Sequence, residues 1–296
     1  SEVSYIMLEI IEELHVLQPG NSVHISSKTP DRFLKEACKV IRQGHGYPSI
    51  FNPDIYIQEM LRQGKSIEDA REGGCSGCIE VGAFGKEAYI LTGYLNVPKI
   101  IEITLNNGMN PVTSKQVSIE TGNPRDFKSY DELYEAFKKQ LNYILNQKVL
   151  VSNYIDRMFA KYSPATFLSV VIDDCISKGK DYYNGGPRYN TNYIQCTGLG
   201  TVTDSLSVLK KHVFENKSFS MDKVLNSVSK NFEGEEILRQ TIINNTPFYG
   251  NDDDYADDIA LQVYNDLFKA IDGKPNTKGE TFHLNMLSTT CHVYFG

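Results

Sequence analysis

The chain has 296 residues, of which 41% are hydrophobic and 23% are charged, a composition typical of a folded globular protein with a substantial core. Its formal net charge is −7 and its Lys and Arg residues form no cluster, which argues against nucleic acid or an anionic membrane surface as a partner. No apolar run approaches the roughly 20 residues of a membrane span, and no leader pattern opens the chain, so we expect a cytoplasmic protein that acts on a small molecule.

The six cysteines are too few and too scattered for a disulfide framework, which predicts reduced thiols. They are Cys38, Cys75, Cys78, Cys175, Cys196 and Cys291.

The first quarter of the chain reads as helices separated by short strands. Apolar spacing predicts a helix over residues 3–14 and a strand over residues 22–26. Two further helices have start signals: Thr29 as a cap before Pro30, and Asn52 as a cap before Pro53. The spacing of Ser66 and Asp69 then predicts a capping box for a very short helix that ends at residues 73–74.

The rest of the chain continues this alternation. Ser129 and Glu132 begin the longest helical pattern, which Pro164 ends. A helical pattern follows over residues 167–177, and later segments predict a turn at residues 185–187, a strand at residues 193–196 and a helix through residues 206–213. Strands and helices at these spacings predict an α/β barrel or sheet.

The stretch GGCSGCIEVGAFGKEAY, residues 73–89, holds the candidate chemistry. Cys75 and Cys78 have the spacing of a zinc half-site or a dithiol pair, but no second ligand pair accompanies them and no long helix follows them. Cysteine hydrolase is a weak alternative, because no histidine accompanies Cys78 locally. The acidic run at residues 251–258 lacks the glycine and final glutamate of a calcium loop and is more typical of a helix start.

Residues 78–82 read as extended chain, in which side chains at positions i and i+2 point to the same side about 7 Å apart. We therefore expect Cys78 and Glu80 to face one cavity, with sulfur acting on one substrate atom while the carboxyl group moves a proton nearby. Glycines at positions 73, 74, 77, 82 and 85 would let the chain turn tightly and approach a ligand. The alternative is a buried cysteine beside a solvated glutamate.

The segment GGCSGCIEVGAFGKEAYILTGY resembles the active-site cysteine loop of the glycyl radical enzymes, the pyruvate formate-lyase-like family, and especially the branch that dehydrates hydroxyproline. The resemblance covers essentially the whole chain. Its other strings are GHGYPSIFN, LNNG, YNTNYIQ, TDSLS, NDDDYADD and TTCHVYFG.

This resemblance implies part of a ten-stranded α/β barrel, roughly the second half barrel with the cysteine loop. Residues 1–296 would then form a single partial catalytic barrel domain, with the N-terminal half barrel and the C-terminal glycyl radical domain outside them. We expect these residues to be an internal piece of a longer polypeptide that forms a homodimer.

The resemblance also implies a radical mechanism. A glycyl radical outside these residues, installed by an S-adenosylmethionine-dependent iron–sulfur activating enzyme, would generate a thiyl radical on Cys78, with Glu80 as general acid/base. Tyr94 and Thr289 match positions that line the substrate pocket, although simple packing would also explain them. The reaction implied is loss of water from hydroxyproline to give a pyrroline-5-carboxylate, with no metal or bound cofactor; Cys75 has no assigned role.

These residues differ from the family's sequence pattern in one respect. The family's Arg-Val-x-Gly-aromatic radical motif is not found among these residues, so we expect them to be inactive alone. Two alternatives stay open: another eliminating member of the family, acting on a diol, choline or a sulfonate, and a non-catalytic module that binds a partner chain. In either case an apolar patch would be exposed where the missing half barrel packs.

Overall fold

The computed structural model describes residues 1–15, 20–44, 46–76 and 79–287. The chain divides into two compact units, one made of Ser1–Tyr89 with Pro164–Asn190 and the other of Ile90–Ser163 with Thr191–Gly296. Helices and strands alternate in the order expected, which confirms the α/β class. None of the described helices is long and apolar enough to cross a membrane.

The first unit begins with helix α1 (Glu2–Leu14), which packs against α2 (Asp31–Ile41) over a small core. Parallel strands β1 (Ser22–His24) and β2 (Ser49–Phe51) follow in register, Val23 opposite Ile50. The buried side chains of this core are Leu8, Ile11, Val23, Ala37 and Val40.

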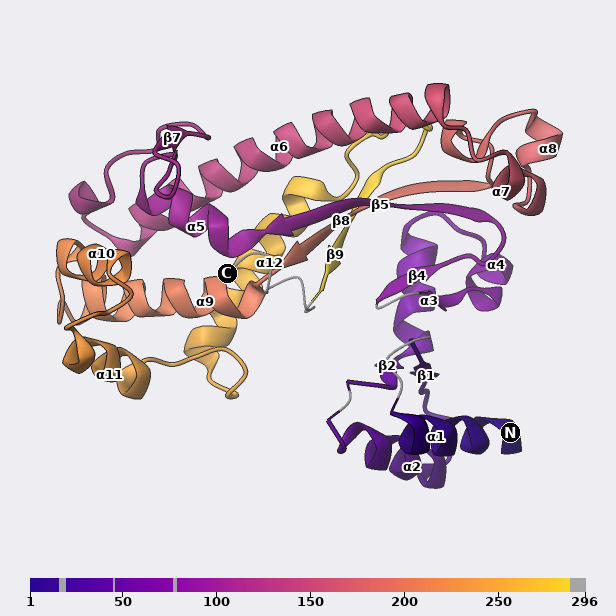
Figure 1. The fold of residues 1–296 in the computed structure, drawn as a ribbon, viewed down its shortest axis with the longest axis horizontal. Helices are drawn as coiled ribbons and strands as arrows, with labels where there is room; N and C mark the ends of the chain where they lie inside the picture. The colour runs from indigo at the N-terminus through magenta and orange to yellow at the C-terminus, as the bar shows by residue number, and fades with distance from the viewer. Residues whose placement is uncertain (16–19, 45, 77–78, 288–296) are drawn as a thin grey trace. The chain divides into compact units, whose positions relative to one another are not determined.

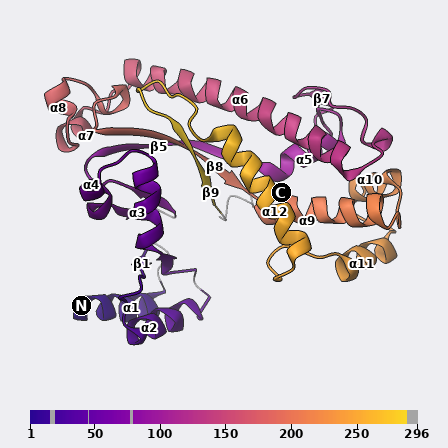
Figure 2. The ribbon, with the colours of Figure 1, turned by 180° about the vertical axis from the view of Figure 1, so that it is seen from behind.

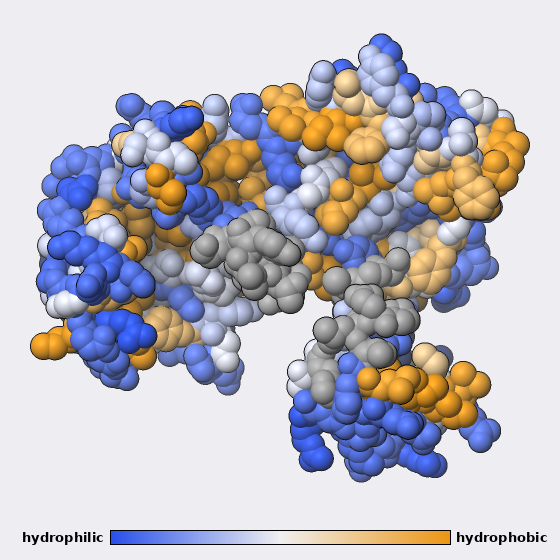
Figure 3. Space-filling view, viewed as in Figure 1, coloured by the Kyte–Doolittle hydropathy of each residue, from blue (hydrophilic) through white to orange (hydrophobic). Residues whose placement is uncertain are grey.

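The outer face of α1 exposes a row of apolar side chains, which appears as an orange surface over this helix in Figure 3. Their exposed fractions run from 40% to 65%, and the residues are Val3, Ile6, Met7, Ile10 and Leu14. Because they recur at helical spacing, α1 has a second apolar face in addition to the one that packs on α2.

Two predicted caps are confirmed in this unit, and a third is wrong. The Asn52 side chain accepts from the Asp54 N–H at the start of α3 (Pro53–Arg62), and the Ser66 side chain accepts from the Asp69 N–H at the start of α4 (Ile67–Glu72). The capping box predicted at Ser66 and Asp69 forms only in part, because the Ser66 N–H donates to the Tyr189 hydroxyl and not to Asp69. Thr29 does not cap α2, which begins after Pro30. Its hydroxyl instead accepts from the Ser26 N–H, so it closes the preceding turn.

The helix predicted over residues 167–177 is interrupted in the structure. It forms two short helices, α7 (Thr166–Val171) and α8 (Cys175–Lys178), followed by a single turn, η2 (Tyr182–Asn184). Asp174 between them has φ 74°, a left-handed conformation that a right-handed helix cannot include.

The second unit contains a three-stranded sheet in the order β5–β8–β9 (Figures 1 and 2). Strands β5 (Glu87–Asn96) and β8 (Tyr189–Thr197) each begin in the first unit and continue in the second. Strand β9 (Phe282–Met286) pairs in parallel with β8, Asn192 opposite Phe282. Because β8 is central, almost all its residues are buried, and the predicted strand at residues 193–196 is its middle.

Helices cover this sheet and supply most of its core. The predicted long helix is α6 (Tyr130–Tyr162), whose Leu141, Leu145 and Val149 pack in the same core as Leu95 of β5. The Ser129 side chain accepts from the Glu132 N–H and so caps α6 as predicted. The other helices are α5 (Val97–Leu105), α9 (Leu199–Val208), the π-helix η3 (Leu209–Glu215), α10 (Met221–Ser229), α11 (Glu236–Asn245) and α12 (Asp254–Ile271). Short elements β6 (Met109–Asn110), β7 (Lys115–Gln116) and η1 (Pro124–Asp126) lie between α5 and α6.

Candidate active site

The candidate chemistry lies on an antiparallel hairpin in the first unit. Strand β3 (Gly74–Ser76) pairs with β4 (Glu80–Gly82), with Gly74 opposite Gly82 and Cys75 opposite Val81. The extended conformation predicted here is thus confirmed for residues 80–82. Cys78 lies outside the described residues, so its shared cavity with Glu80 stays a prediction.

Glu80 is the first residue of β4, and its side chain is half-buried. Its Oε2 accepts a hydrogen bond from the Ile79 N–H at 2.9 Å. A carboxyl group in this position can exchange a proton with a ligand beside the hairpin, which is the role expected of a general acid/base.

Three glycines at the base of the hairpin lie close to neighbouring atoms. A Cβ at Gly73 would lie 2.4 Å from the Gly82 carbonyl oxygen, and a Cβ at Gly74 would lie 3.0 Å from the Phe84 ring. A Cβ at Gly82 would lie 2.8 Å from Glu87 Oε2. The backbone contact at Gly73 leaves no room for a side chain, whereas at Gly74 and Gly82 the side chains of Phe84 and Glu87 would have to shift. The predicted close approach of these glycines to a ligand stays a prediction.

A histidine and a tyrosine lie next to the hairpin. His24 Nδ1 and the Tyr56 hydroxyl form a hydrogen bond of 3.0 Å, and the His24 ring approaches within 3.2 Å of the position of a Gly74 Cβ. Burial lowers the pKa of His24. Burial raises the pKa of Tyr56, and a negative charge on Cys75 would raise it further. Both groups are therefore neutral at pH 7, and the Cys75 thiol beside them is not part of a disulfide.

The turn after β4 is held by a buried ion pair. Glu87 Oε2 accepts the Ala83 N–H at 2.8 Å, and Glu87 Oε1 lies 3.2 Å from Lys65 Nζ. The Lys65 and Glu87 side chains are only 1% and 2% exposed.

A second set of ionic contacts lies in the same unit, around Asp69 of α4. This carboxylate accepts hydrogen bonds from Lys86 Nζ at 2.7 Å, the Tyr189 hydroxyl at 2.8 Å and Arg188 Nη1 at 3.1 Å. The Lys86 hydrogen bond, with smaller contributions from Tyr189 and Arg188, holds the pKa of Asp69 well below its usual range.

Neither group of ionic contacts has a recognisable sequence signal. The sequence predicts only a turn at residues 185–187, and Gly185 does adopt a left-handed turn conformation with φ 78°. The contact between Arg188 and Asp69 spans 119 positions, so local patterns could not reveal it.

Of the two predicted pocket residues, only Tyr94 is among the described residues, and it belongs to the other unit. Tyr94 lies on β5 with 42% of its surface exposed. Thr289 lies outside the described residues. Glu80 and Tyr94 are therefore placed within separate units, and their common pocket stays a prediction.

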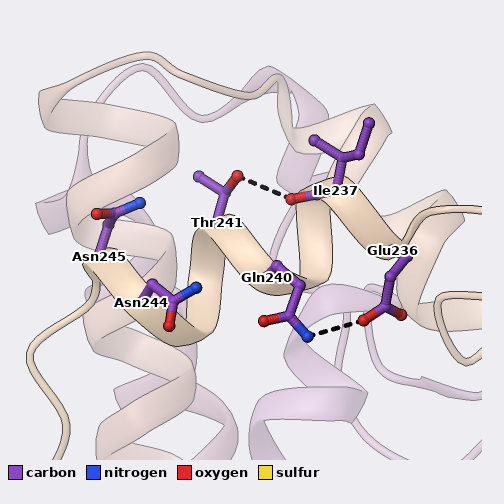
Figure 4. Close-up of a pocket in the computed structure, with 6 residues that line it drawn as sticks. All are labelled: Glu236, Ile237, Gln240, Thr241, Asn244 and Asn245. Carbon is purple, nitrogen blue, oxygen red and sulfur yellow. Dashed lines mark hydrogen bonds between the residues drawn. The ribbon is translucent and has the colours of Figure 1, made fainter.

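Other features of the second unit offer weaker candidates. The acidic run at residues 251–258 is the start of α12, where the Asp253 side chain accepts from the Tyr255 N–H, so the predicted helix start is confirmed. A hollow beside α11 is lined by residues of that one helix, whose hydrogen bonds, such as Gln240 to Glu236, stay within it (Figure 4). Among the described residues, no group of three or more His, Cys, Asp or Glu side chains could hold a metal ion.

Comparison with known proteins identifies the family. The family model described as pyruvate formate lyase-like matches residues 1–296, so the chain belongs to the pyruvate formate lyase-like family. It is 52% identical over 296 residues to the trans-4-hydroxy-L-proline dehydratase of Clostridioides difficile, and it spans 38% of the length of that relative.

Solved structures agree with this assignment. The chain matches the crystal structure of hydroxyproline dehydratase from Clostridioides difficile with trans-4-hydroxy-L-proline bound, with a TM-score of 0.94, over 100% of this chain and 38% of that one. It also matches the glycerol-bound form of the B12-independent glycerol dehydratase from Clostridium butyricum, with a TM-score of 0.90 and 32% identity, over 100% of this chain and 37% of that one.

Proposed function

We propose that these residues belong to a radical dehydratase that removes water from trans-4-hydroxyproline to give a pyrroline-5-carboxylate. The observation that carries this proposal is the 52% identity to the Clostridioides difficile dehydratase, which extends over the whole chain. The glycerol dehydratase has nearly the same fold but only 32% identity. Fold alone therefore does not separate the substrates, and the sequence favours hydroxyproline.

The fold proposal follows from the same relatives. Residues 1–296 form part of a ten-stranded α/β barrel, roughly the second half barrel with the cysteine hairpin, in a single partial catalytic domain. The first half barrel and the glycyl radical domain belong to other parts of the complete polypeptide, which acts as a homodimer in the cytoplasm. The exposed apolar face of α1 supports this arrangement, because exposed apolar patches mark surfaces that pack against another chain segment.

The residues of this chain have distinct roles in the proposed reaction. The glycyl radical, installed by an S-adenosylmethionine-dependent iron–sulfur activating enzyme, supplies the unpaired electron. The Cys78 sulfur takes a hydrogen atom from the ring carbon next to nitrogen, and the hydroxyl group leaves the neighbouring carbon. Glu80 accepts the proton of the ring nitrogen and passes it to the departing hydroxide, which leaves as water. Cys78 then returns its hydrogen atom to the carbon that carried the hydroxyl group, so the product contains a C=N bond. Tyr94 and Thr289 contact the substrate.

The test uses the complete polypeptide encoded by the source gene. After anaerobic activation, the glycyl radical is measured by electron paramagnetic resonance, and the protein is incubated separately with trans-4-hydroxyproline, glycerol and 1,2-propanediol. We expect a pyrroline-5-carboxylate from hydroxyproline and no turnover by Cys78→Ser. Radical formation with turnover of a diol but not of hydroxyproline would show that the substrate proposal is wrong and would favour the diol alternative.

A further inference from the structure

The carboxylate of Glu87 reaches back across a turn to the hairpin that carries Glu80. Glu87 is the first residue of β5, and the turn at residues 83–86 separates it from the last residue of β4. Its Oε2 accepts the Ala83 N–H at 2.8 Å, a contact in which both groups are buried. The end of β4 is therefore tied to the start of β5 by a side chain in addition to the backbone.

Lys65 holds this carboxylate in place. Its ammonium group lies 3.2 Å from Glu87 Oε1 and donates to Gln63 Oε1 at 2.6 Å. The Lys65 backbone is fixed in turn, because its N–H donates to the Met60 carbonyl at the end of α3 and the next residue, Ser66, caps α4. The ion pair thus connects the turn after β4 to two helices.

The packing around the carboxylate leaves little freedom. A Cβ at Gly82 would lie 2.8 Å from Glu87 Oε2, so the β4 backbone and the carboxylate are in close contact. Because both charged side chains are almost completely buried, moving either one would separate two opposite charges in the interior, which is strongly unfavourable. Through its hydrogen bond with the Ala83 N–H, the fixed Glu87 carboxylate can therefore restrict movement of the end of β4.

We propose that Glu87, held by Lys65, is a positioning residue that fixes strand β4 and with it the Glu80 carboxyl group. Glu80 lies two residues before Gly82 in a three-residue strand, so a shift at the tied end is transmitted directly to it. This inference rests on the proposed function, in which Glu80 moves a proton during dehydration. A proton-transfer group that is misplaced by about 1 Å can lower the rate about a hundredfold.

The experiment compares two charge-neutral double variants of the complete, activated enzyme. Lys65→Met with Glu87→Gln removes both charges but keeps an oxygen that can accept the Ala83 N–H. Lys65→Met with Glu87→Met removes the same charges and also the acceptor. An exposed ion pair in the same unit, Lys39 with Glu36 at 2.9 Å, provides the matched control through Lys39→Met with Glu36→Gln.

We expect the exposed-pair control to keep kcat within about twofold of the unsubstituted enzyme. The glutamine variant loses the Lys65 contact but keeps the acceptor for the Ala83 N–H, so it should lose less than about tenfold in kcat. The methionine variant should lose about tenfold to a hundredfold in kcat with KM and glycyl radical content unchanged. A purely structural role would instead lower the amount of folded enzyme and leave kcat per radical intact. Equal kcat values for the two double variants would overturn the proposal.

Two further measurements keep the test decisive. Glu87→Asp keeps the charge but shortens the side chain, so it should lower kcat in the same way even if the methionine variant does not fold; an unchanged kcat would overturn the proposal. Hydrogen exchange of peptides covering residues 79–89 needs no substrate, and it should be faster in Glu87→Asp than in the unsubstituted enzyme. If the unsubstituted enzyme carries the radical but does not consume hydroxyproline, the proposed function is wrong. The positioning role of Glu87 is still tested in that case, because the hydrogen exchange measurement does not depend on the substrate.

Discussion

The Glu80 carboxyl group is half-buried at the start of β4 and accepts the Ile79 N–H. We expect Glu80→Gln in the complete enzyme to lower kcat at least about a hundredfold, because the amide cannot accept the proton, while its similar size preserves substrate binding and KM. Steady-state kinetics on hydroxyproline, normalised to glycyl radical content, measures this effect.

Glu68→Gln is a suitable control for this change, because Glu68 is an exposed carboxylate on the neighbouring α4 helix and should tolerate the substitution. A Glu80→Gln enzyme with kcat within a few-fold of the unsubstituted protein would remove Glu80 from the mechanism. The assignment of general acid/base would then pass to another group.

At the level of single residues, the sequence indicated only the local part of the site. Cys78 and Glu80 could be predicted as a pair because they are two positions apart in a segment that reads as extended chain and is flanked by glycines. Lys65 and Glu87, and likewise Asp69 and Arg188, are brought together by folding of distant segments, and an isolated charged residue is usually solvated. Such pairs cannot be read from one sequence.

At the level of elements, Asp69 connects helix α4 to the turn before β5 and to the segment before β8 through Lys86 and Arg188. These contacts hold the pKa of Asp69 below its value in the unfolded chain, which is about 3.9. The unfolded state therefore binds more protons in mild acid, so the stabilisation by Asp69 is fully present above about pH 5 and is lost as the pH falls through the folded pKa.

Because Asp69 stabilises the fold only when it is ionised, the midpoint of thermal unfolding should differ between the unsubstituted chain and Asp69→Asn by an amount that depends on pH. The variant should have a lower midpoint of thermal unfolding at pH 7, and the difference should shrink steadily between pH 5 and pH 3. Circular dichroism melts at matched ionic strength measure it. A difference that stays constant over this pH range would mean that the ionised carboxylate does not stabilise the fold.

Local sequence signals predicted most elements of this molecule, and they failed where the backbone departs from a regular helix. Asn52, Ser66 and Ser129 cap helices because their side chains reach an N–H two or three residues ahead, a purely local contact. The left-handed Asp174 interrupts a helix that periodicity predicts as continuous, and η3 continues α9 as a π-helix. Side-chain spacing alone does not distinguish these conformations.

At the level of the whole molecule, the chain belongs to the pyruvate formate lyase-like family and spans only part of the length of its relatives. The family model matches all 296 residues, and the chain spans 38% of the length of the Clostridioides difficile relative. The division into two compact units was not predicted from the sequence, because it depends on contacts between residues 1–89 and the distant segment Pro164–Asn190. Short-range periodicity contains no information on such contacts.

A polypeptide made of residues 1–296 alone is expected to show no dehydratase turnover. Its sequence contains Cys78 and Glu80 but no Arg-Val-x-Gly-aromatic motif, so an activating enzyme has no motif glycine on which to form the radical. After anaerobic incubation with the activating enzyme and S-adenosylmethionine, we expect neither a glycyl radical signal nor a product from hydroxyproline. The Clostridioides difficile dehydratase, treated in the same way, provides the positive control. Product that disappears in Cys78→Ser would contradict the prediction, because it would require a radical source within these residues.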